Sequence, residues 1–320
     1  MIISQVHNMK FMMGVSQKTM AGISTLWLLT ALSSAYADSV VIPEQTKEKE
    51  PTPAEKAVAS EDSFTSTFWM IASKDVQFGP IKTADTYLEY EYSANVGPFM
   101  LYGYFDFPKF FGTGSANDKG IWDKGSPLFT EQKPKMSLNK AFGKDLSVGP
   151  IKDWYLAGNW IYDNGDSRAS RQNTLYMGVG AEVDTGTKWT LNPNIYVKRQ
   201  WENYGAANEN SWDGYRLQLQ YGHPIASFAN GSKLDYYGFT NFDFGSKLAD
   251  KDGTGTRTNN SVVATNILVY GFTHVKAFTV ARYFHNGGQW KDGSTLNFGD
   301  GEFQGHSTGW AYYVGLGYSF

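Results

Sequence analysis

The segment from Gly309 to the C-terminal Phe320 alternates between large apolar side chains and mostly small ones. Trp310 and Leu316 belong to the large face, and Gly317 belongs to the small face. A strand with two such faces meets hydrocarbon on one side and a crowded interior on the other. A chain that stops on an aromatic residue at the end of such a strand is typical of bacterial outer-membrane barrels. The segment therefore favours a membrane β-barrel over a soluble β protein.

The composition agrees with a membrane barrel and excludes several other classes. With 16% aromatic residues and a mean hydropathy of -0.40, the chain is too polar for a helical membrane protein and too aromatic for a disordered one. In a barrel only alternate residues meet lipid, so the summed hydropathy stays low. The absence of cysteine excludes a disulfide scaffold and thiolate metal sites. A net charge of -3 indicates no polyanion-binding surface, so nucleic acid as a polymer is not expected as a partner.

The N-terminus has the features of a secretory signal peptide spanning residues 1–37. Lys10 and Lys18 supply positive charge, residues 21–32 form an apolar run, and small residues precede a cleavage site near Ala37. A membrane anchor is the alternative, but the apolar run is shorter than the roughly 20 residues that a spanning helix needs. We therefore expect the mature protein to begin next to Ala37.

Residues 38–63 are rich in Pro, Glu, Lys, Thr and Ala and cannot bury enough apolar surface to offset the entropy of ordering. We interpret them as a flexible, acidic and proline-rich periplasmic segment. A plug or a cell-wall-binding function is the alternative. The remaining residues, 64–320, form the predicted outer-membrane barrel.

Between residues 64 and 320 the chain divides into about twelve strand-like segments, many of them near the 9 to 11 residues that a tilted membrane strand requires. Long connections follow odd-numbered segments, notably at 108–131, 244–259 and 286–306, while those after even-numbered segments are comparatively short. With the N-terminus in the periplasm, every long loop lies outside the cell. The predicted fold class is all-β, a transmembrane antiparallel up-and-down β-barrel of about 12 strands. The predicted strands are 64–73, 85–94, 98–107, 132–138, 151–162, 172–183, 189–200, 213–222, 233–243, 260–271, 277–285 and 307–320.

Alternation within the strands also predicts which side chains face the lumen. In the segment around Glu89 and Glu91, Leu88 and Tyr90 share the lipid-facing parity, which leaves the two carboxylates inside. An ion facing lipid at mid-membrane costs roughly 2 to 4 kcal/mol, so Arg282 should also point inward. The residues that this argument assigns to the lumen are Tyr87, Glu89, Glu91, Tyr104, Asp106, Tyr196, Lys198, Arg216, Phe239, Asp243 and Arg282.

This lumen combines aromatic rings with charges of both signs. For any single residue the simpler explanation is that small barrels fill their interior with ion pairs and hydrogen bonds for stability. Taken as a set, flat aromatic faces beside carboxylates and cations form a surface on which a heterocyclic base can stack and a sugar hydroxyl can hydrogen-bond. Periodicity alone predicts a narrow polar pore with an aromatic lining and does not identify the solute.

Several stretches, in order along the chain, match the nucleoside-specific channel family Tsx of enteric bacteria, and we take them as a resemblance to that family. They are FGP at 78–80, DTYLEYE at 85–91, GIW at 120–122, GSPLF at 125–129, NYGAANEN at 203–210, WDGYR at 212–216, GFTNFD at 238–243, TRTNNS at 256–261, ARY at 281–283 and GGQW at 287–290.

The resemblance implies a monomeric, twelve-stranded barrel in the outer membrane of a Gram-negative bacterium. It also implies passive diffusion of nucleosides and deoxynucleosides through a narrow channel without a cofactor, and a surface that phages and colicins use as a receptor. In the family the Phe-Gly-Pro motif supplies a channel aromatic that contacts nucleoside, and Phe78 occupies that place here. A basic residue is expected before it, where this chain has Gln77. Outer-membrane lipid surrounds such a barrel, and the strand ending at Phe320 is the signal read by the outer-membrane assembly machinery.

With nucleosides as the solute, the lumen residues take specific roles. We expect Phe78 and the lumen aromatics Tyr87, Tyr104, Tyr196 and Phe239 to stack on the base. The four lumen carboxylates would accept hydrogen bonds from ribose hydroxyls, while the three lumen cations balance them and meet the carbonyls of the base.

Three other functions remain as alternatives. A lipase-type enzyme is poorly supported, because His306 and Ser307 are adjacent and would point to opposite faces of an extended strand. A general small-solute porin would sort solutes by size and charge, whereas a nucleoside channel should saturate at low nucleoside concentration. An adhesin or purely structural barrel predicts negligible solute flux.

Overall fold

The computed structural model describes residues 62–114, 127–299 and 301–320. The predicted signal peptide and nearly all of the predicted periplasmic segment lie outside the described residues, as does the GIW motif. In the part of the chain that the structure describes, no helix is long and apolar enough to span a membrane.

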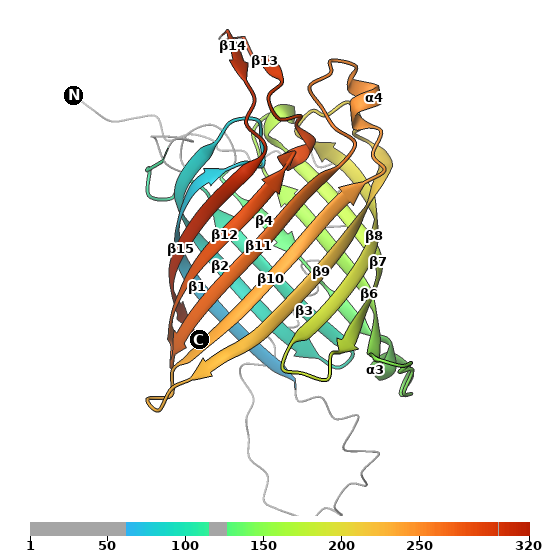
Figure 1. Cartoon of the computed structure of the whole chain (residues 1–320), viewed down its shortest axis with the longest axis vertical. Coiled ribbons are helices and arrows are strands. Elements are labelled where there is room, and N and C mark those ends of the chain that lie inside the picture. The colour runs from blue at the N-terminus through green and yellow to red at the C-terminus, as the bar shows by residue number, and fades with distance from the viewer. Residues whose placement is uncertain (1–61, 115–126, 300) are drawn as a thin grey trace, which may run out of the picture. The chain divides into compact units, whose positions relative to one another are not determined.

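The described residues form a closed antiparallel β-barrel (Figure 1). The sheet contains thirteen strands, and because β4 and β5 fill one position between β3 and β6, the barrel has twelve strand positions. Each strand position pairs with the two beside it in the barrel, β12 with β15 across the β13–β14 hairpin, and β1 closes the barrel by pairing with β15. The predicted fold class is thus confirmed. The barrel strands are β1 (Ser63–Val76), β2 (Thr83–Val96), β3 (Phe99–Phe107), β4 (Phe129–Gln132), β5 (Lys135–Ser137), β6 (Ile151–Asp163), β7 (Gln172–Asp184), β8 (Thr190–Asn203), β9 (Ser211–Ser227), β10 (Lys233–Phe244), β11 (Ser261–Phe272), β12 (Val275–His285) and β15 (Gly309–Ser319).

The two ends of the barrel differ in their connections. One end carries the longer loops, which contain the short helices η1 (Arg168–Ser170), α4 (Leu248–Asp252) and η2 (Gly287–Gln289) and the hairpin of β13 (Thr295–Asn297) and β14 (Glu302–Gln304). The other end carries the C-terminus, several tight turns and helix α3 (Leu138–Phe142) (Figure 1). The long loops therefore gather at one end, as the loop lengths predicted.

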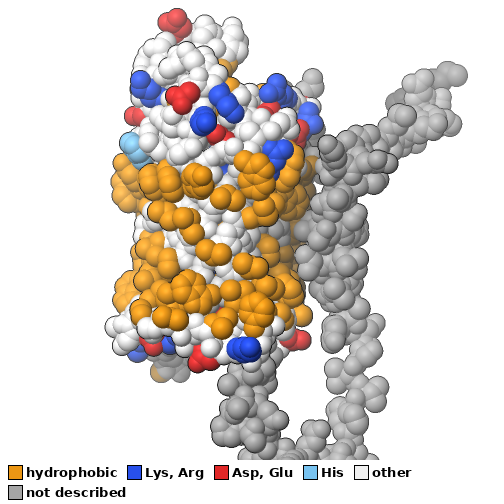
Figure 2. All heavy atoms as spheres, turned by 90° about the vertical axis from the view of Figure 1, so that its right-hand side faces the viewer, with side chains coloured by type: hydrophobic (Ala, Val, Ile, Leu, Met, Phe, Trp, Pro, Cys, Tyr) orange, Lys and Arg blue, Asp and Glu red, His pale blue; other side chains and the backbone are white. Residues whose placement is uncertain are grey.

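The outer face of the barrel is apolar, and the C-terminal strand shows why. Trp310, Val314 and Leu316 are each about half exposed, whereas Ala311 and Tyr313 on the opposite face are buried. Figure 2 shows hydrophobic side chains across the visible face of the barrel, with charged side chains gathered above and beneath them. A transmembrane barrel presents such a surface to lipid.

The core of the molecule is the inner wall of the barrel rather than a layer between sheets. Trp69, Val280 and Tyr313 belong to an apolar cluster built from β1, β11, β12 and β15. Tyr176 and Tyr196 belong to a second, smaller cluster on β6, β7 and β8. Between these two clusters the inner wall is mostly polar and charged.

Two predicted strands differ most from the structure, while the others agree to within about three residues at each end. The strand expected at 132–138 is interrupted at Lys133 and Pro134, because proline has no N–H to donate to the ladder. The carbonyl of Pro134 still accepts a 2.8 Å hydrogen bond from Gly158 N on β6. The strand expected to end at residue 222 continues to Ser227. Beyond Gly222 this strand pairs with β10 and no longer with β8, and its register with β10 shifts beside Pro224. The missing N–H of Pro224 therefore breaks no hydrogen bond to β8.

Candidate functional site

A cavity of about 1460 Å³ lies inside the barrel, and residues from the barrel strands and from the long loops line it. All of the predicted site residues except Tyr196 border this cavity. They come from β2, β3, β8, β9, β10 and β12, together with Phe78 from the loop between β1 and β2. The alternation of side chains along each strand therefore places distant segments of the chain around one space.

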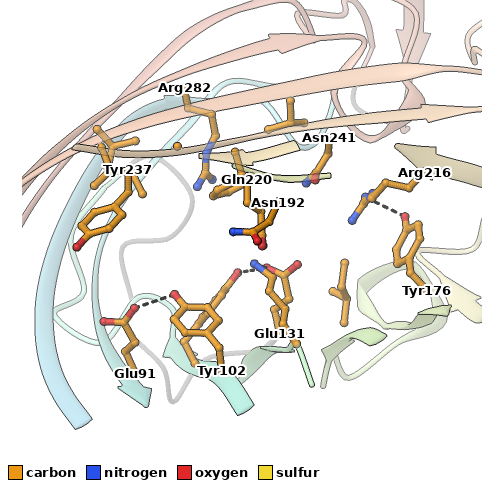
Figure 3. A pocket seen from close by; sticks show the side chains of 18 of the residues that line it. Glu91, Tyr102, Glu131, Tyr176, Asn192, Arg216, Gln220, Tyr237, Asn241 and Arg282 are labelled. Carbon is orange, nitrogen blue, oxygen red and sulfur yellow. Dashed lines mark hydrogen bonds and ion pairs between the residues drawn. The ribbon is translucent and has the colours of Figure 1, made fainter. Parts of the chain in front are cut away.

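Carboxylates and tyrosines form one wall of the cavity. The Tyr102 hydroxyl donates a 2.7 Å hydrogen bond to Glu91, whose second oxygen accepts a 2.8 Å bond from the Trp69 indole. Glu131 accepts hydrogen bonds of 2.6 Å from Tyr104 and 2.8 Å from Asn159. Figure 3 shows Glu91, Tyr102 and Glu131 on the side of the cavity that faces Arg282, Asn241 and Arg216. The wall formed by β2, β3 and β4 is therefore rich in carboxylates.

Glu89 and Asp106 add two further carboxyl groups to the same wall. They are direct cross-strand partners in the β2–β3 ladder and both border the cavity. Tyr87 lies two residues before Glu89 on the same inward face and packs against the apolar cluster around Trp69. The predicted carboxylates of β2 and β3 thus share one part of the lining.

Two arginines reach into the cavity from the opposite side. Arg282 donates hydrogen bonds of 2.9 Å to the Thr265 hydroxyl and 3.1 Å to the Tyr313 hydroxyl. Arg216 donates two 2.8 Å bonds to Asp243, and its guanidinium carbon lies 3.8 Å from the centre of the Tyr176 ring. The guanidinium of Arg282 is thus held mainly by neutral hydroxyls, whereas the guanidinium of Arg216 forms an ion pair with the carboxylate of Asp243.

Two cations lie near the ring of Phe239, which borders the cavity. The Lys133 ammonium is 5.2 Å from the centre of its ring, and the Arg282 guanidinium carbon is 5.9 Å from it. Lys133 belongs to the β4–β5 segment across the barrel from β10, and its ammonium also forms a 3.1 Å ion pair with Glu131. Side chains from opposite walls therefore meet at Phe239, and this contact narrows the lumen beside that residue.

Phe78 projects from the loop that joins β1 to β2. Its side chain is 53% exposed. The centre of its ring lies 4.9 Å from the centre of the Phe284 ring in an edge-to-face arrangement, and 5.4 Å from the Arg282 guanidinium carbon. The adjacent Gln77 is fully buried and donates to backbone carbonyls of Asp75 and Trp310. The neutral residue at position 77 therefore does not border the cavity, and Arg282 supplies the positive charge beside Phe78.

Tyr196 points inward but does not border the cavity. Its side chain is only 2% exposed, because it packs in the cluster with Ala157 and Tyr176, and its hydroxyl donates a 3.3 Å hydrogen bond to Gln218. The strand parity assigned to Tyr196 agrees with the structure. Its ring, however, has no face turned toward a solute.

Two further contacts cross the barrel. The Lys135 ammonium on β5 donates a 2.7 Å hydrogen bond to Gln220 on β9. The Lys198 ammonium on β8 donates a 3.3 Å bond to Gln289, which belongs to the loop between β12 and β15. Together with the contact of Lys133 with Phe239, these bonds connect opposite parts of the cavity lining and narrow the lumen.

Removing the Lys135 bridge should loosen the channel. We expect Lys135→Ala to raise the flux of a free pentose sugar through reconstituted protein by about threefold, since one hydrogen bond worth roughly 0.5–1.5 kcal/mol no longer holds the two walls together. Lys188→Ala is the matched control, because it removes the same charge from an exposed cavity-lining position near the same end. Equal sugar flux through both variants would show that the bridge does not limit passage.

An arginine–tryptophan stack marks the loop end of the cavity. The Arg257 guanidinium carbon lies 3.5 Å from the centre of the Trp290 ring, and Arg257 donates a 3.3 Å hydrogen bond to the carbonyl of Gly288. Burial lowers the pKa of Arg257 to about 10, against the opposing effect of Asp252. Arg257 therefore keeps its charge at neutral pH and remains a cation over the indole ring.

Sequence reasoning missed several lining residues that the structure brings into the cavity. Tyr102 shares the inward parity of Tyr104 and Asp106, so alternation places it in the lumen as well. Glu131 lies in the connection predicted at 108–131, ahead of the strand expected at 132–138, so alternation assigned it no face. Lys133 and Lys135 flank Pro134, where the strand is interrupted, so alternation gave no secure face for them. Among the described residues, no group of three or more His, Asp and Glu side chains is arranged to hold a metal ion.

Comparison with known proteins finds a matching family model and several similar proteins. The family model described as "Nucleoside-specific channel-forming protein, Tsx" matches residues 61–320. The chain is 49% identical over 272 residues to the nucleoside-specific channel-forming protein Tsx of Salmonella typhimurium, covering 83% of this chain and 93% of that protein. It is 48% identical over 274 residues to the protein of the same name from Klebsiella aerogenes, covering 82% and 92%. A solved structure of the NanC porin is similar with a TM-score of 0.42 and 10% identity, covering 80% of this chain and 99% of that one.

Proposed function

The chain belongs to the Tsx family of nucleoside-specific channel-forming proteins, and from this premise we propose that nucleosides and deoxynucleosides cross its lumen by passive diffusion between weak aromatic and polar binding sites. The protein is a nucleoside-specific channel of the Gram-negative outer membrane. Because the family consists of transport channels, the prediction that this chain is not an enzyme is confirmed.

The observation that carries the proposal is the arrangement of aromatic rings and charges along one cavity. Phe78 and Phe239 both lie within 6 Å of the Arg282 guanidinium carbon, on a path lined on its other side by Glu91 and Glu131. A base can stack on either ring while its carbonyl oxygens meet the guanidinium and the ribose hydroxyls meet a carboxylate. Stacking is worth roughly 1 to 3 kcal/mol per base and tolerates different bases.

Weak attraction at several places suits a channel, because a solute must enter and leave readily. Tyr87 and Tyr104 offer further ring faces, and Glu89 and Asp106 further acceptors, along the carboxylate-rich wall. Lys198 supplies a cation nearer the long loops. Arg216 and Asp243 are largely occupied by one another, which supports a mainly structural contribution from this pair.

We extend the proposal to the parts of the protein that surround the channel. The mature chain begins near Ala37, and residues 38–63 form a periplasmic extension. In the described residues every barrel strand is paired on both sides, so the barrel offers no edge to a neighbour, which supports a monomer. The assembly machinery reads the C-terminal strand, and the long loops form the surface that phages or colicins use.

The test is uptake of labelled adenosine and thymidine at sub-micromolar concentration by proteoliposomes that carry the refolded mature protein, with a sugar of similar mass in parallel. Nucleoside flux that saturates and exceeds sugar flux is the expected result. Equal flux of both solutes would contradict binding sites in the lumen. Absence of flux through a correctly folded barrel would contradict the transport proposal itself.

A further inference from the structure

The loop that carries Phe78 meets a tight turn of another extracellular loop at very close range. The turn spans Asn286 to Trp290 and includes η2. An ideal Cβ added at Gly287 would lie 1.8 Å from the carbonyl oxygen of Gln77, and one added at Gly288 would lie 2.1 Å from the carbonyl oxygen of Phe78. Neither distance is possible for a real Cβ. Only glycine at these two positions allows the backbones to approach so closely.

The turn is held in a conformation that is unusual for its sequence. Asn286, Gly288 and Gln289 have φ angles of 52°, 59° and 61°, all in the left-handed region. Such residues persist only where the surrounding structure holds them in place. Gln289 receives that support from Lys198, which donates to its side-chain oxygen at 3.3 Å, and from the carbonyl of Thr258, to which its amide donates at 3.2 Å.

The backbone of the turn is fixed as well. The Gly287 N–H donates a 2.8 Å bond to the Ser307 carbonyl, and the Gly288 carbonyl accepts the 3.3 Å bond from Arg257. On the other side, the Pro80 carbonyl of the Phe78 loop accepts a 2.7 Å bond from His306 N. The Phe78 loop therefore rests against a turn that is itself anchored to the barrel wall and to neighbouring loops.

From this contact we propose that Gly288 is a positioning residue for Phe78, and that it sets the nucleoside affinity of the channel without touching the solute through a side chain. The two glycines fix where the Phe78 backbone lies, and that backbone fixes how the ring stands over Arg282. A Cβ at position 288 displaces the Phe78 carbonyl and moves the ring away from the base that stacks on it. The inference rests on the proposed function, because it assigns a residue to the same nucleoside site.

The test compares Gly288→Ala with Gly293→Ala. Both glycines lie in the same loop with positive φ angles, 59° and 68°, but a Cβ at Gly293 has nothing within 4 Å. The strain of an alanine in the left-handed region is thus matched, and only the contact with Phe78 differs. Gly288→Ala should raise the half-saturating nucleoside concentration by about fivefold or more, while flux at saturating nucleoside stays within about twofold of the parent. Gly293→Ala should leave both values unchanged.

A double variant separates positioning from a general loss of structure. When Phe78→Ala is already present, adding Gly288→Ala should not raise the half-saturating concentration further, because the ring that Gly288 positions is gone. An additional rise in the double variant would overturn the proposal. So would equal half-saturating concentrations for Gly288→Ala and Gly293→Ala in a channel that otherwise saturates with nucleoside. If the parent protein shows no saturable nucleoside flux, the proposed function itself fails.

A chemical probe gives a second readout that does not depend on transport. The chain has no cysteine, so Phe78→Cys introduces a single thiol whose reaction rate with a water-soluble thiol reagent reports the position of residue 78. Adding Gly288→Ala should change that rate by about threefold or more, and adding Gly293→Ala should leave it unchanged. If Gly288→Ala does not fold, Gln289→Ala loosens the same turn by removing the bonds to Lys198 and Thr258. It should shift the thiol rate in the same way, and an unchanged rate would overturn the proposal.

Discussion

Replacing Phe78 with alanine is expected to raise the half-saturating concentration of nucleosides by about 5- to 150-fold, the equivalent of the roughly 1 to 3 kcal/mol that stacking contributes per base. The ring stands at the loop end of the cavity, half exposed, with Arg282 5.4 Å from its centre. A base that stacks on this ring would also face the guanidinium. Flux at saturating nucleoside should change little, because the variant widens the lumen and breaks no hydrogen bond between strands. The measurement is proteoliposome uptake of adenosine and thymidine over a range of concentrations.

The control for this prediction is Phe142→Ala. Phe142 is an exposed phenylalanine at the end of α3, and it does not border the cavity. Its removal tests whether loss of any surface aromatic alters uptake. If Phe78→Ala and Phe142→Ala have the same half-saturating concentration as the parent, the nucleoside does not stack on Phe78, even though the protein is a nucleoside channel.

Much of the architecture could be predicted because a barrel strand encodes its faces locally. Trp310, Val314 and Leu316 alternate with small residues in the sequence, and the structure exposes the former on the outer face. The cost of placing an ion in lipid assigned Arg282 to the interior without knowledge of its neighbours. The same period of two placed Glu89 and Glu91 in the lumen. Strand number and facing are thus properties that short stretches of sequence determine.

The contacts across the lumen could not be predicted in this way. Lys133 meets Phe239, and Lys135 meets Gln220, between strands that are never neighbours in the sheet. Which side chains meet across a barrel depends on strand stagger and tilt, which are global properties of closure. Parity also cannot distinguish a ring that faces the cavity from one buried beneath its neighbours, which is why Tyr196 was expected to stack on a base.

The apposition of Phe78 with Gly288 belongs to the same class of unpredictable features. The two residues are separated by most of the barrel sequence, yet one backbone carbonyl lies where a Cβ would stand on the other. The motifs FGP and GGQW were both visible in the sequence as parts of one resemblance. Only the folded loops show that they form a single contact.

Arg216 is the residue whose loss should most weaken the barrel. Its guanidinium is almost fully buried, and it donates two 2.8 Å hydrogen bonds to Asp243 on the adjacent strand. It also donates a 2.9 Å bond to the hydroxyl of Tyr176 while lying over the same ring. Strands β7, β9 and β10 are therefore linked through one side chain. Its removal leaves the Asp243 carboxylate without its partner in a poorly solvated interior.

Arg216→Ala is accordingly expected to lower the free energy of unfolding by about 3–5 kcal/mol, the usual cost of breaking a buried ion pair by removing one partner. The measurement is reversible urea unfolding of the barrel in detergent or lipid. Arg168→Ala is the matched control, because Arg168 forms an ion pair of 2.7 Å with Glu209 but is 68% exposed, and such pairs contribute about 0–1 kcal/mol. Replacing both partners, Arg216→Met with Asp243→Leu, should recover most of the lost stability, since no unpaired charge remains. An Arg216→Ala variant that is no less stable than Arg168→Ala would mean that water in the lumen solvates Asp243 well enough to replace the guanidinium.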